Sequence, residues 1–284
     1  MTRIADLVAA GRTLSFELFP PKTEEAERQL EKCVLELAEL EPSFVSVTYG
    51  ALGSTRDRTR AAVTRINAEQ PFPAMPHLTC VGHTRADIDE LLDGYAEAGI
   101  ENILALGGDP PADGTAVTGD FTYASELLEV VRSHPAGFSV GVAAHPEVHP
   151  RSPDRASDRR HLAAKLERAD FAMTQFFFDV AHYARLVEEL DALGCRKPVL
   201  PGVMPFVSVA GVRRMAAMNA THIPDDLQVR LDEVDGDPEA VRRLGVEVAT
   251  RLCQELLGLG VPGLHLYALN RSESVREVVA SLEL

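Results

Sequence analysis

The sequence alternates between short apolar runs rich in β-branched residues and longer segments in which apolar residues recur every three or four positions. This alternation is typical of repeated βα units, whose strands form a parallel sheet. We expect eight strands, the number in a (β/α)8 barrel, so the predicted fold is α/β, a single TIM barrel over residues 1–284. The expected strands are residues 14–19, 44–48, 76–80, 102–106, 138–144, 171–178, 198–203 and 263–269.

The segments between these strands have helical periodicity. In residues 24–40, for example, Leu30, Val34 and Leu37 fall on one helix face, which would lie on the sheet. A short helix is expected at residues 4–10, before the first strand. Residues 219–236 hold Pro224 and several acidic residues, and are interpreted as an insertion before the eighth strand. The other expected helices are residues 56–68, 85–98, 123–133, 156–168, 180–193, 209–218 and 238–259.

The net charge and the lack of membrane, signal-peptide and metal-binding motifs argue against several classes of protein. Against 28 Lys and Arg stand 43 Asp and Glu, and the net charge of −15 would repel nucleic acid and anionic lipid. No run approaches the roughly 18 to 20 apolar residues of a membrane helix, and the N-terminus lacks the apolar core of a signal peptide. We therefore expect a cytoplasmic protein. The four cysteines are scattered and His145 and His149 lack an evident third ligand, so no metal site is predicted.

One carboxylate needs an explanation within the first strand. Glu17 lies between Phe16 and Leu18, which point to the opposite side of an extended chain. Pro20 and Pro21 end the strand, because each lacks a backbone N–H. Glu17 is therefore expected near the carboxyl end of the strand. There it either forms a salt bridge with a neighbouring strand or faces a cavity in which its carboxylate is used.

Polar, glycine and proline residues collect after every expected strand, at the barrel end that carries active sites. Taken singly, these residues have simpler interpretations. The glycine pair 107–108 fits a tight turn capped by Asp109, Gln175 fits a hydrogen-bonded core amide, and Arg271 fits a surface cation. Arg271 is also well placed to pair with a ligand carboxylate or phosphate. The collection at one end of the barrel favours a functional site.

The segments at the strand ends are residues 15–23, 44–51 with 54–59, 76–80, 99–111, 146–150, 174–179, 201–205 and 269–271. In this order, over nearly the whole chain, they resemble the methylenetetrahydrofolate reductase family. The resemblance implies a (β/α)8 barrel that reduces the folate 5,10-methylenetetrahydrofolate to 5-methyltetrahydrofolate. It also implies NADH or NADPH as hydride donor, usually acting through bound FAD.

The same resemblance implies roles for individual residues. Glu17 corresponds to the general acid that helps open the methylene bridge to a reactive iminium ion, and Asp109 to an aspartate near the flavin and the pterin. Gln175 corresponds to a pterin-binding amide, Arg271 to a residue for the glutamate tail of folate, and Phe206 lies near a position that stacks on the ligand. The residues implied to contact FAD are Thr48, His77, Gly108, His145, His149, Asp158 and Lys165.

The chain departs from the family at positions that help hold the flavin. Gly107 stands where typical members have an arginine, His145 where they have a tyrosine, and Val209 where some have a stacking phenylalanine. Losing one charge-assisted contact and one aromatic contact would remove about 2 to 5 kcal/mol of cofactor binding. Two versions of the enzyme follow. Either FAD binds through the remaining contacts, or, as we hypothesise, flavin binding is impaired and the nicotinamide delivers hydride directly to the folate.

Two other functions are alternatives: a non-catalytic folate-binding barrel, and another lyase or transferase that uses one-carbon folates. A retained proton donor favours an enzyme over a binding protein. Turnover without a nicotinamide nucleotide would indicate the lyase or transferase. The sequence does not distinguish NADH from NADPH, because it lacks a dinucleotide fingerprint. It also leaves open whether the chain forms a homo-oligomer.

Overall fold

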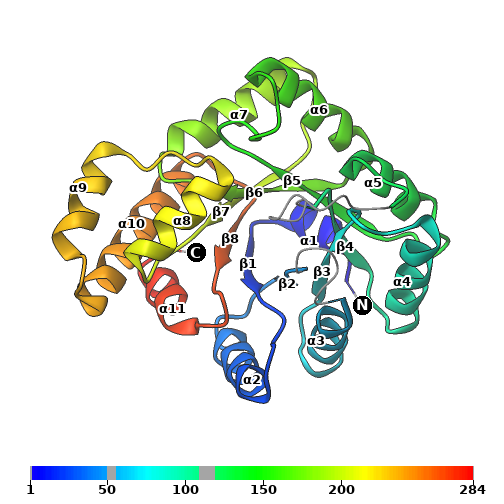
Figure 1. The fold of residues 1–284 in the computed structure, drawn as a ribbon, viewed down its shortest axis with the longest axis horizontal. Coiled ribbons are helices and arrows are strands. Elements are labelled where there is room, and N and C mark those ends of the chain that lie inside the picture. The colour runs from blue at the N-terminus through cyan, green and yellow to red at the C-terminus, as the bar shows by residue number, and fades with distance from the viewer. Residues whose placement is uncertain (1, 50–55, 109–118, 284) are drawn as a thin grey trace.

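The computed structural model, which describes residues 2–49, 56–108 and 119–283, is a closed barrel of eight parallel strands surrounded by helices (Figure 1). Each strand pairs with the next in the sequence, and β1 closes the ring on β8, with Glu17 opposite Tyr267. This confirms the predicted (β/α)8 fold. The strands are β1 Thr13–Leu18, β2 Phe44–Val47, β3 Ala74–Thr79, β4 Asn102–Leu106, β5 Ser139–Ala144, β6 Phe171–Phe176, β7 Val199–Val203 and β8 Gly263–Tyr267.

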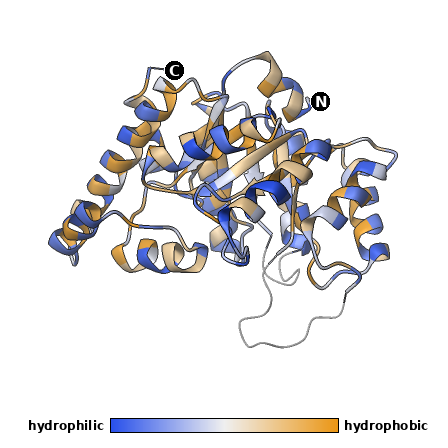
Figure 2. Ribbon diagram, turned by 90° about the horizontal axis from the view of Figure 1, so that it is seen from above, coloured by the Kyte–Doolittle hydropathy of each residue, from blue (hydrophilic) through white to orange (hydrophobic). Residues whose placement is uncertain are grey.

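The helices pack around the barrel with one apolar face toward the strands. In Figure 2 they carry hydrophilic and hydrophobic residues in alternation, as this arrangement requires. On α2, the predicted Leu30, Val34 and Leu37 are all buried. The helices are α1 Ile4–Ala10, α2 Glu24–Ala38, α3 Arg56–Glu69, α4 Arg85–Glu97, α5 Ala124–Ser133, α6 Arg155–Arg168, α7 Val180–Ala192, α8 Val209–Asn219, α9 Asp225–Val234, α10 Pro238–Gly258 and α11 Ser272–Ala280.

The short helix α1 covers the amino-terminal end of the barrel. The backbone N–H of Ile4 donates to Asn102 Oδ1 at 2.7 Å, and that of Ala5 donates to Ser139 Oγ at 3.2 Å. Ile4 and Val8 pack with Phe44 and other apolar residues inside the barrel. These contacts use free N–H groups of the first helical turn and fill one end of the barrel. The carboxyl ends of the strands are left for a site.

Two helices differ from the prediction. Residues 219–236, expected as an insertion to which no helix was assigned, contain α9, and α11 follows β8 where no helix was assigned. Pro224 is the N-cap of α9 rather than part of an irregular loop. Leu227 and Leu231 are the buried residues of α9 and pack in a cluster with residues of α8 and α10. The insertion therefore packs into an apolar cluster that also includes Phe176 of β6 and Tyr267 of β8.

Candidate functional site

Glu17 faces the barrel interior near the carboxyl ends of the strands. The residue is 7% exposed, and its Oε2 lies 3.7 Å from His77 Nε2 on β3 and 3.6 Å from His265 Nε2 on β8. Ser46, opposite Glu17 on β2, is also buried. Histidines are charged only when protonated, so these partners do not give the carboxylate a permanent counter-ion. The carboxylate thus lies in a buried polar layer whose net charge depends on whether Glu17 and the two histidines are protonated.

His77, which the family resemblance assigned to the flavin, lies beside Glu17. It is 6% exposed, and its Nε2 has no hydrogen-bond partner within the described residues. Burial lowers the pKa of His77 to about 4, and the nearby Glu17 carboxylate opposes part of that shift. His77 is therefore neutral near pH 7. Thr79, two residues further along the same strand, also has a buried hydroxyl with no hydrogen-bond partner among the described residues.

Tyr267 and His265 belong to the same polar layer, and the sequence analysis missed both. The hydroxyl of Tyr267 donates to the backbone oxygen of Thr174 at 3.2 Å. Burial, followed by the charge of Glu17, raises the pKa of Tyr267 well above its usual value. The signal was present in the alternation of residues 263–267, which places positions 265 and 267 on one face of β8.

Gln175 lies at the carboxyl end of β6 and is half-buried. Its Oε1 accepts from Asn219 Nδ2, the last residue of α8, at 3.4 Å. The neighbouring Thr174 accepts from the backbone N–H of Gly202 through its Oγ at 2.8 Å. Among the described residues, the amide of Gln175 therefore has this one long hydrogen bond, which leaves most of its hydrogen-bonding capacity for a ligand.

His145 and His149 lie together after β5. Their rings are 4.5 Å apart, and both residues are half-buried. Burial, followed by the neighbouring His149 and Lys165, lowers the pKa of His145 to about 3. Lys165 of α6 donates from Nζ to the backbone oxygen of Ala143 at 3.1 Å, and burial lowers the pKa of its ammonium. The structure thus brings three of the predicted flavin residues together.

Asp158 organises this same loop. Its Oδ1 accepts from the backbone N–H of His149 at 3.2 Å and from Ser152 Oγ at 3.0 Å, and its Oδ2 accepts from Arg159. Arg159 is 2% exposed and was not predicted. It donates to the backbone oxygens of His145, Pro146 and Glu147 at 3.1, 2.8 and 2.9 Å, and to Glu189 at 2.8 Å. The buried pair of Asp158 and Arg159 therefore fixes the loop after β5.

The glycine pair after β4 has a conformational reason. Gly108 has a φ of +82°, and a Cβ there would lie 2.4 Å from Val81 Cγ1, so no other residue fits without rearrangement. Arg151 Nη2 donates to the backbone oxygen of Gly108 at 3.5 Å. Two other predicted residues come after strand ends in the sequence. Thr48, predicted to contact FAD, follows β2 and is half-buried, and its backbone oxygen accepts from Thr59 Oγ1 at 2.9 Å. Asp109, predicted to lie near the flavin and the pterin, is outside the described residues, so its role stays a prediction.

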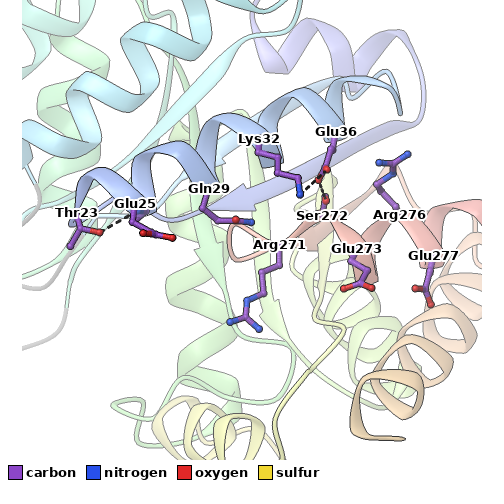
Figure 3. A pocket seen from close by; sticks show the side chains of 11 residues that line it. Thr23, Glu25, Gln29, Lys32, Glu36, Arg271, Ser272, Glu273, Arg276 and Glu277 are labelled. Carbon is purple, nitrogen blue, oxygen red and sulfur yellow. Dashed lines mark hydrogen bonds and ion pairs between the residues drawn. The ribbon is translucent and has the colours of Figure 1, made fainter. Parts of the chain in front are cut away.

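Arg271 lies outside the barrel mouth itself. It is exposed and lines a groove of about 1020 Å³ between α2 and α11, and its side chain points away from the α2 side chains in Figure 3. Before it, Leu269 and Asn270 have φ of 52° and 59°, an uncommon conformation for both. Asn270 stabilises this turn, because its Oδ1 accepts from Phe19 N at 2.8 Å and its Nδ2 donates to Phe19 O at 2.9 Å. Asn270 thereby ties the end of β8 to the end of β1.

Phe206 is not exposed toward the Glu17 layer. Its side chain is 3% exposed and packs edge-on against Phe178, with ring centroids 6.3 Å apart. It belongs to the apolar cluster that joins β6 and β8, through Phe176 and Tyr267, to α8, α9 and α10. Contact between Phe206 and a ligand would require this cluster to open.

The described residues contain no group of three His, Cys, Asp or Glu side chains that could hold a metal ion. No helix among them is long and apolar enough to cross a membrane.

Comparison with known proteins identifies the family. The profile of methylenetetrahydrofolate reductase matches residues 2–283. The 5,10-methylenetetrahydrofolate reductase of Pectobacterium carotovorum subsp. carotovorum is 36% identical over 92% of this chain and 86% of its own. That of Escherichia coli strain K12 is 36% identical over 92% of this chain and 87% of its own. A relative from Zea mays, named methylenetetrahydrofolate reductase (NADH) 1, is 34% identical over 99% of this chain and 50% of its own.

Among solved structures, an uncharacterized protein from Clostridium thermocellum that binds two copies of 5-methyl-5,6,7,8-tetrahydrofolic acid has a TM-score of 0.67. It is 13% identical and covers 97% of this chain and 96% of its own, a likeness that shows the fold alone. The sequence matches, by contrast, extend through the strand ends that build the site. The chain therefore belongs to the methylenetetrahydrofolate reductase family.

Proposed function

We propose that the protein reduces 5,10-methylenetetrahydrofolate to 5-methyltetrahydrofolate with a hydride from NADH. The observation that carries this proposal is the placement of Glu17 at the catalytic end of the barrel, buried and without a permanent counter-ion. A carboxylate in this position can hold a proton and give it to a bound substrate. Family membership supplies the substrate and the reaction, and a relative named for NADH supports that donor.

The chemistry requires one proton and one hydride for each turnover. Glu17 donates its proton to a nitrogen of the methylene bridge, one C–N bond of the bridge breaks, and the other nitrogen forms an iminium ion with the bridge carbon. Hydride from the nicotinamide then adds to that carbon and gives the methyl group, while NADH becomes NAD⁺. The protein has to hold the hydride-donating carbon of the nicotinamide within about 3 to 3.5 Å of the bridge carbon of the iminium ion, and to exclude water.

The substrate would lie across the carboxyl ends of the strands. Gln175 has donors and acceptors for a pterin edge, and the unpartnered polar atoms of His77 and Thr79 face the same end of the barrel. Asp109 is proposed to contact the pterin. Arg271, exposed after β8, is proposed to meet the carboxylates of the folate tail. These ligand contacts rest on the family resemblance together with the positions of the residues.

The residues matched to FAD do not fit a tightly bound flavin. Both carboxylate oxygens of Asp158 accept hydrogen bonds from the protein, and the ammonium of Lys165 is bonded to a backbone oxygen. A ribose or phosphate would have to displace these contacts at a cost, because the groups are desolvated. Together with Gly107 and His145 in place of the usual arginine and tyrosine, this favours direct hydride transfer from NADH.

The purified protein is expected to show no flavin absorption bands and to retain little FAD after incubation with an excess and gel filtration. The matched control is the double variant Gly107→Arg/His145→Tyr. A Cβ at Gly107 would meet its nearest atoms, Arg151 Nη2 and Ala124 N, at 3.6 and 3.7 Å, which are ordinary contact distances, so the backbone there accepts a side chain. This variant should retain FAD about tens- to thousands-fold better. A yellow wild-type protein with tightly held FAD would contradict direct transfer.

The function itself is tested by mixing the protein with NADH and 5,10-methylenetetrahydrofolate. One NADH should be oxidised for each 5-methyltetrahydrofolate formed, and omitting either substrate should stop the reaction. NADPH is assayed in parallel. Folate binding without NADH oxidation would instead indicate a non-catalytic binding barrel. Consumption of the folate without any nicotinamide nucleotide would indicate a lyase or transferase.

A further inference from the structure

A hydrogen-bond chain inside the barrel assigns the proton of His265. Ser15 Oγ lies 3.2 Å from the backbone oxygen of Leu264 and 2.9 Å from His265 Nδ1. A carbonyl oxygen can only accept, so the contact with Leu264 is a hydrogen bond only when the Ser15 hydroxyl donates to it. Both contacts are then satisfied together only when Nδ1 of His265 carries a hydrogen and donates it to Ser15 Oγ. In the neutral ring, Nε2 is consequently the nitrogen without a proton.

That bare nitrogen faces Glu17. His265 Nε2 lies 3.6 Å from Glu17 Oε2, and Ser46 Oγ lies 3.5 Å from Nε2, at the limit of a hydrogen bond. The ring is 1% exposed, stacks on Phe44 with a centroid distance of 6.2 Å, and meets the edge of Tyr267 at 5.7 Å. An ionised carboxylate facing this lone pair in a dry interior would be repelled by it. A proton shared between Glu17 and His265 would remove this repulsion.

The other titratable groups around this pair do not supply that proton. His77, on β3, lies 3.7 Å from the same carboxylate oxygen, and its lowered pKa of about 4 keeps it neutral near pH 7. Tyr267, on β8, keeps its phenolic proton and donates it to Thr174. Ser15 on β1 and Ser46 on β2 complete the polar surroundings with hydroxyls that do not titrate. This leaves His265 Nε2, 3.6 Å from Glu17 Oε2, as the nitrogen that can share a proton with Glu17.

We propose that His265 is a positioning residue that keeps Glu17 protonated and ready to donate its proton to the substrate. This rests on the proposed function, in which Glu17 is the proton donor. In the reaction the Glu17 proton moves to the folate nitrogen, and the C–N electron pair of the breaking bond remains on that nitrogen. The pair of Glu17 and His265 is then short of one proton, which it takes from solvent before the next turnover.

Two substitutions separate the nitrogens of the ring. His265→Asn places an amide N–H near Nδ1, where it can still donate to Ser15, but removes Nε2. His265→Gln places an amide near Nε2 that cannot exchange a proton. In both variants we expect the alkaline limb of kcat/KM to move to lower pH by about one unit, because the repulsion that disfavours the deprotonated carboxylate is gone. Activity at neutral pH should fall about tenfold and recover as the pH is lowered.

A loss of activity that is equal at every pH would show a structural role only and would overturn the proposal. A second readout does not depend on turnover. With ¹⁵N-labelled histidine, NMR should show His265 protonated at Nδ1 near pH 7, and Glu17→Gln should shift the Nε2 resonance. A ring with Nδ1 bare would overturn the inference even in an active enzyme. If the wild-type protein lacks reductase activity while the NMR result holds, the proposed function fails and the proton assignment stands.

Discussion

Replacing Glu17 with glutamine is expected to lower kcat/KM for 5,10-methylenetetrahydrofolate by about 100- to 10,000-fold, the range that a positioned general acid supplies. Glutamine has nearly the same shape, so it fills the space between His77 and His265, but it cannot give up a proton to the methylene bridge. Binding of the product 5-methyltetrahydrofolate should change little, because the pterin contacts proposed for Gln175 and Asp109 remain. The defect should therefore appear mainly in kcat.

Steady-state NADH oxidation measures the loss of kcat and kcat/KM in Glu17→Gln. Titration with 5-methyltetrahydrofolate in the absence of NADH measures ligand binding. Glu17→Asp is the matched control, since it keeps a carboxyl group but withdraws it by one methylene, and should retain an intermediate rate. Thermal unfolding of both variants controls for damage to the barrel. Turnover by Glu17→Gln within threefold of wild type would remove Glu17 from the role of general acid and leave it as a structural partner of the two histidines.

Most of the barrel could be predicted because its signals are local. Strand β4 matches the expected residues 102–106, and the other strands differ by one or two residues at their ends. Helix α9 was missed because the residues at its start fit a loop as well as a helix. Pro224 and the acidic residues after it are common in loops, but proline is also accepted at a helix start, and Asp225 and Asp226 favour the positive end of the helix dipole. Only packing against α8 and α10 resolves this ambiguity.

The candidate site was predicted where a residue is unusual for its strand, as Glu17 is. His265 was missed because a histidine within an apolar strand is unremarkable until closure of β8 on β1 brings it to Glu17. Arg159 was missed for a similar reason. An arginine followed by Arg160 in a polar helix predicts an exposed face, whereas the backbone oxygens that bury Arg159 come from a loop that sequence periodicity does not place.

Arg159→Met is expected to lower the free energy of unfolding by about 3 to 5 kcal/mol, because it leaves the buried carboxylate of Asp158 without its charged partner. The same change removes the donors to the backbone oxygens of Pro146 and Glu147, which adds unsatisfied buried acceptors. Urea unfolding near pH 7 measures the loss. Arg160→Met is the matched control, since it removes the same charge from an exposed position on the same helix and should cost less than about 0.5 kcal/mol.

The double variant Asp158→Asn/Arg159→Met separates the two causes of the lost stability, the unpaired charge of Asp158 and the unsatisfied backbone oxygens. If an uncompensated charge dominates, neutralising Asp158 should recover part of the stability lost in Arg159→Met, so the two changes would not be additive. If the loss comes only from the backbone oxygens, the double variant should be no more stable than the single one. A cost for Arg159→Met no larger than that for Arg160→Met would show that the loop after β5 is held by other contacts. In that case Oδ2 of Asp158 would be available to a ligand, and the argument against a tightly bound flavin would keep only the contacts of Asp158 Oδ1 and of Lys165.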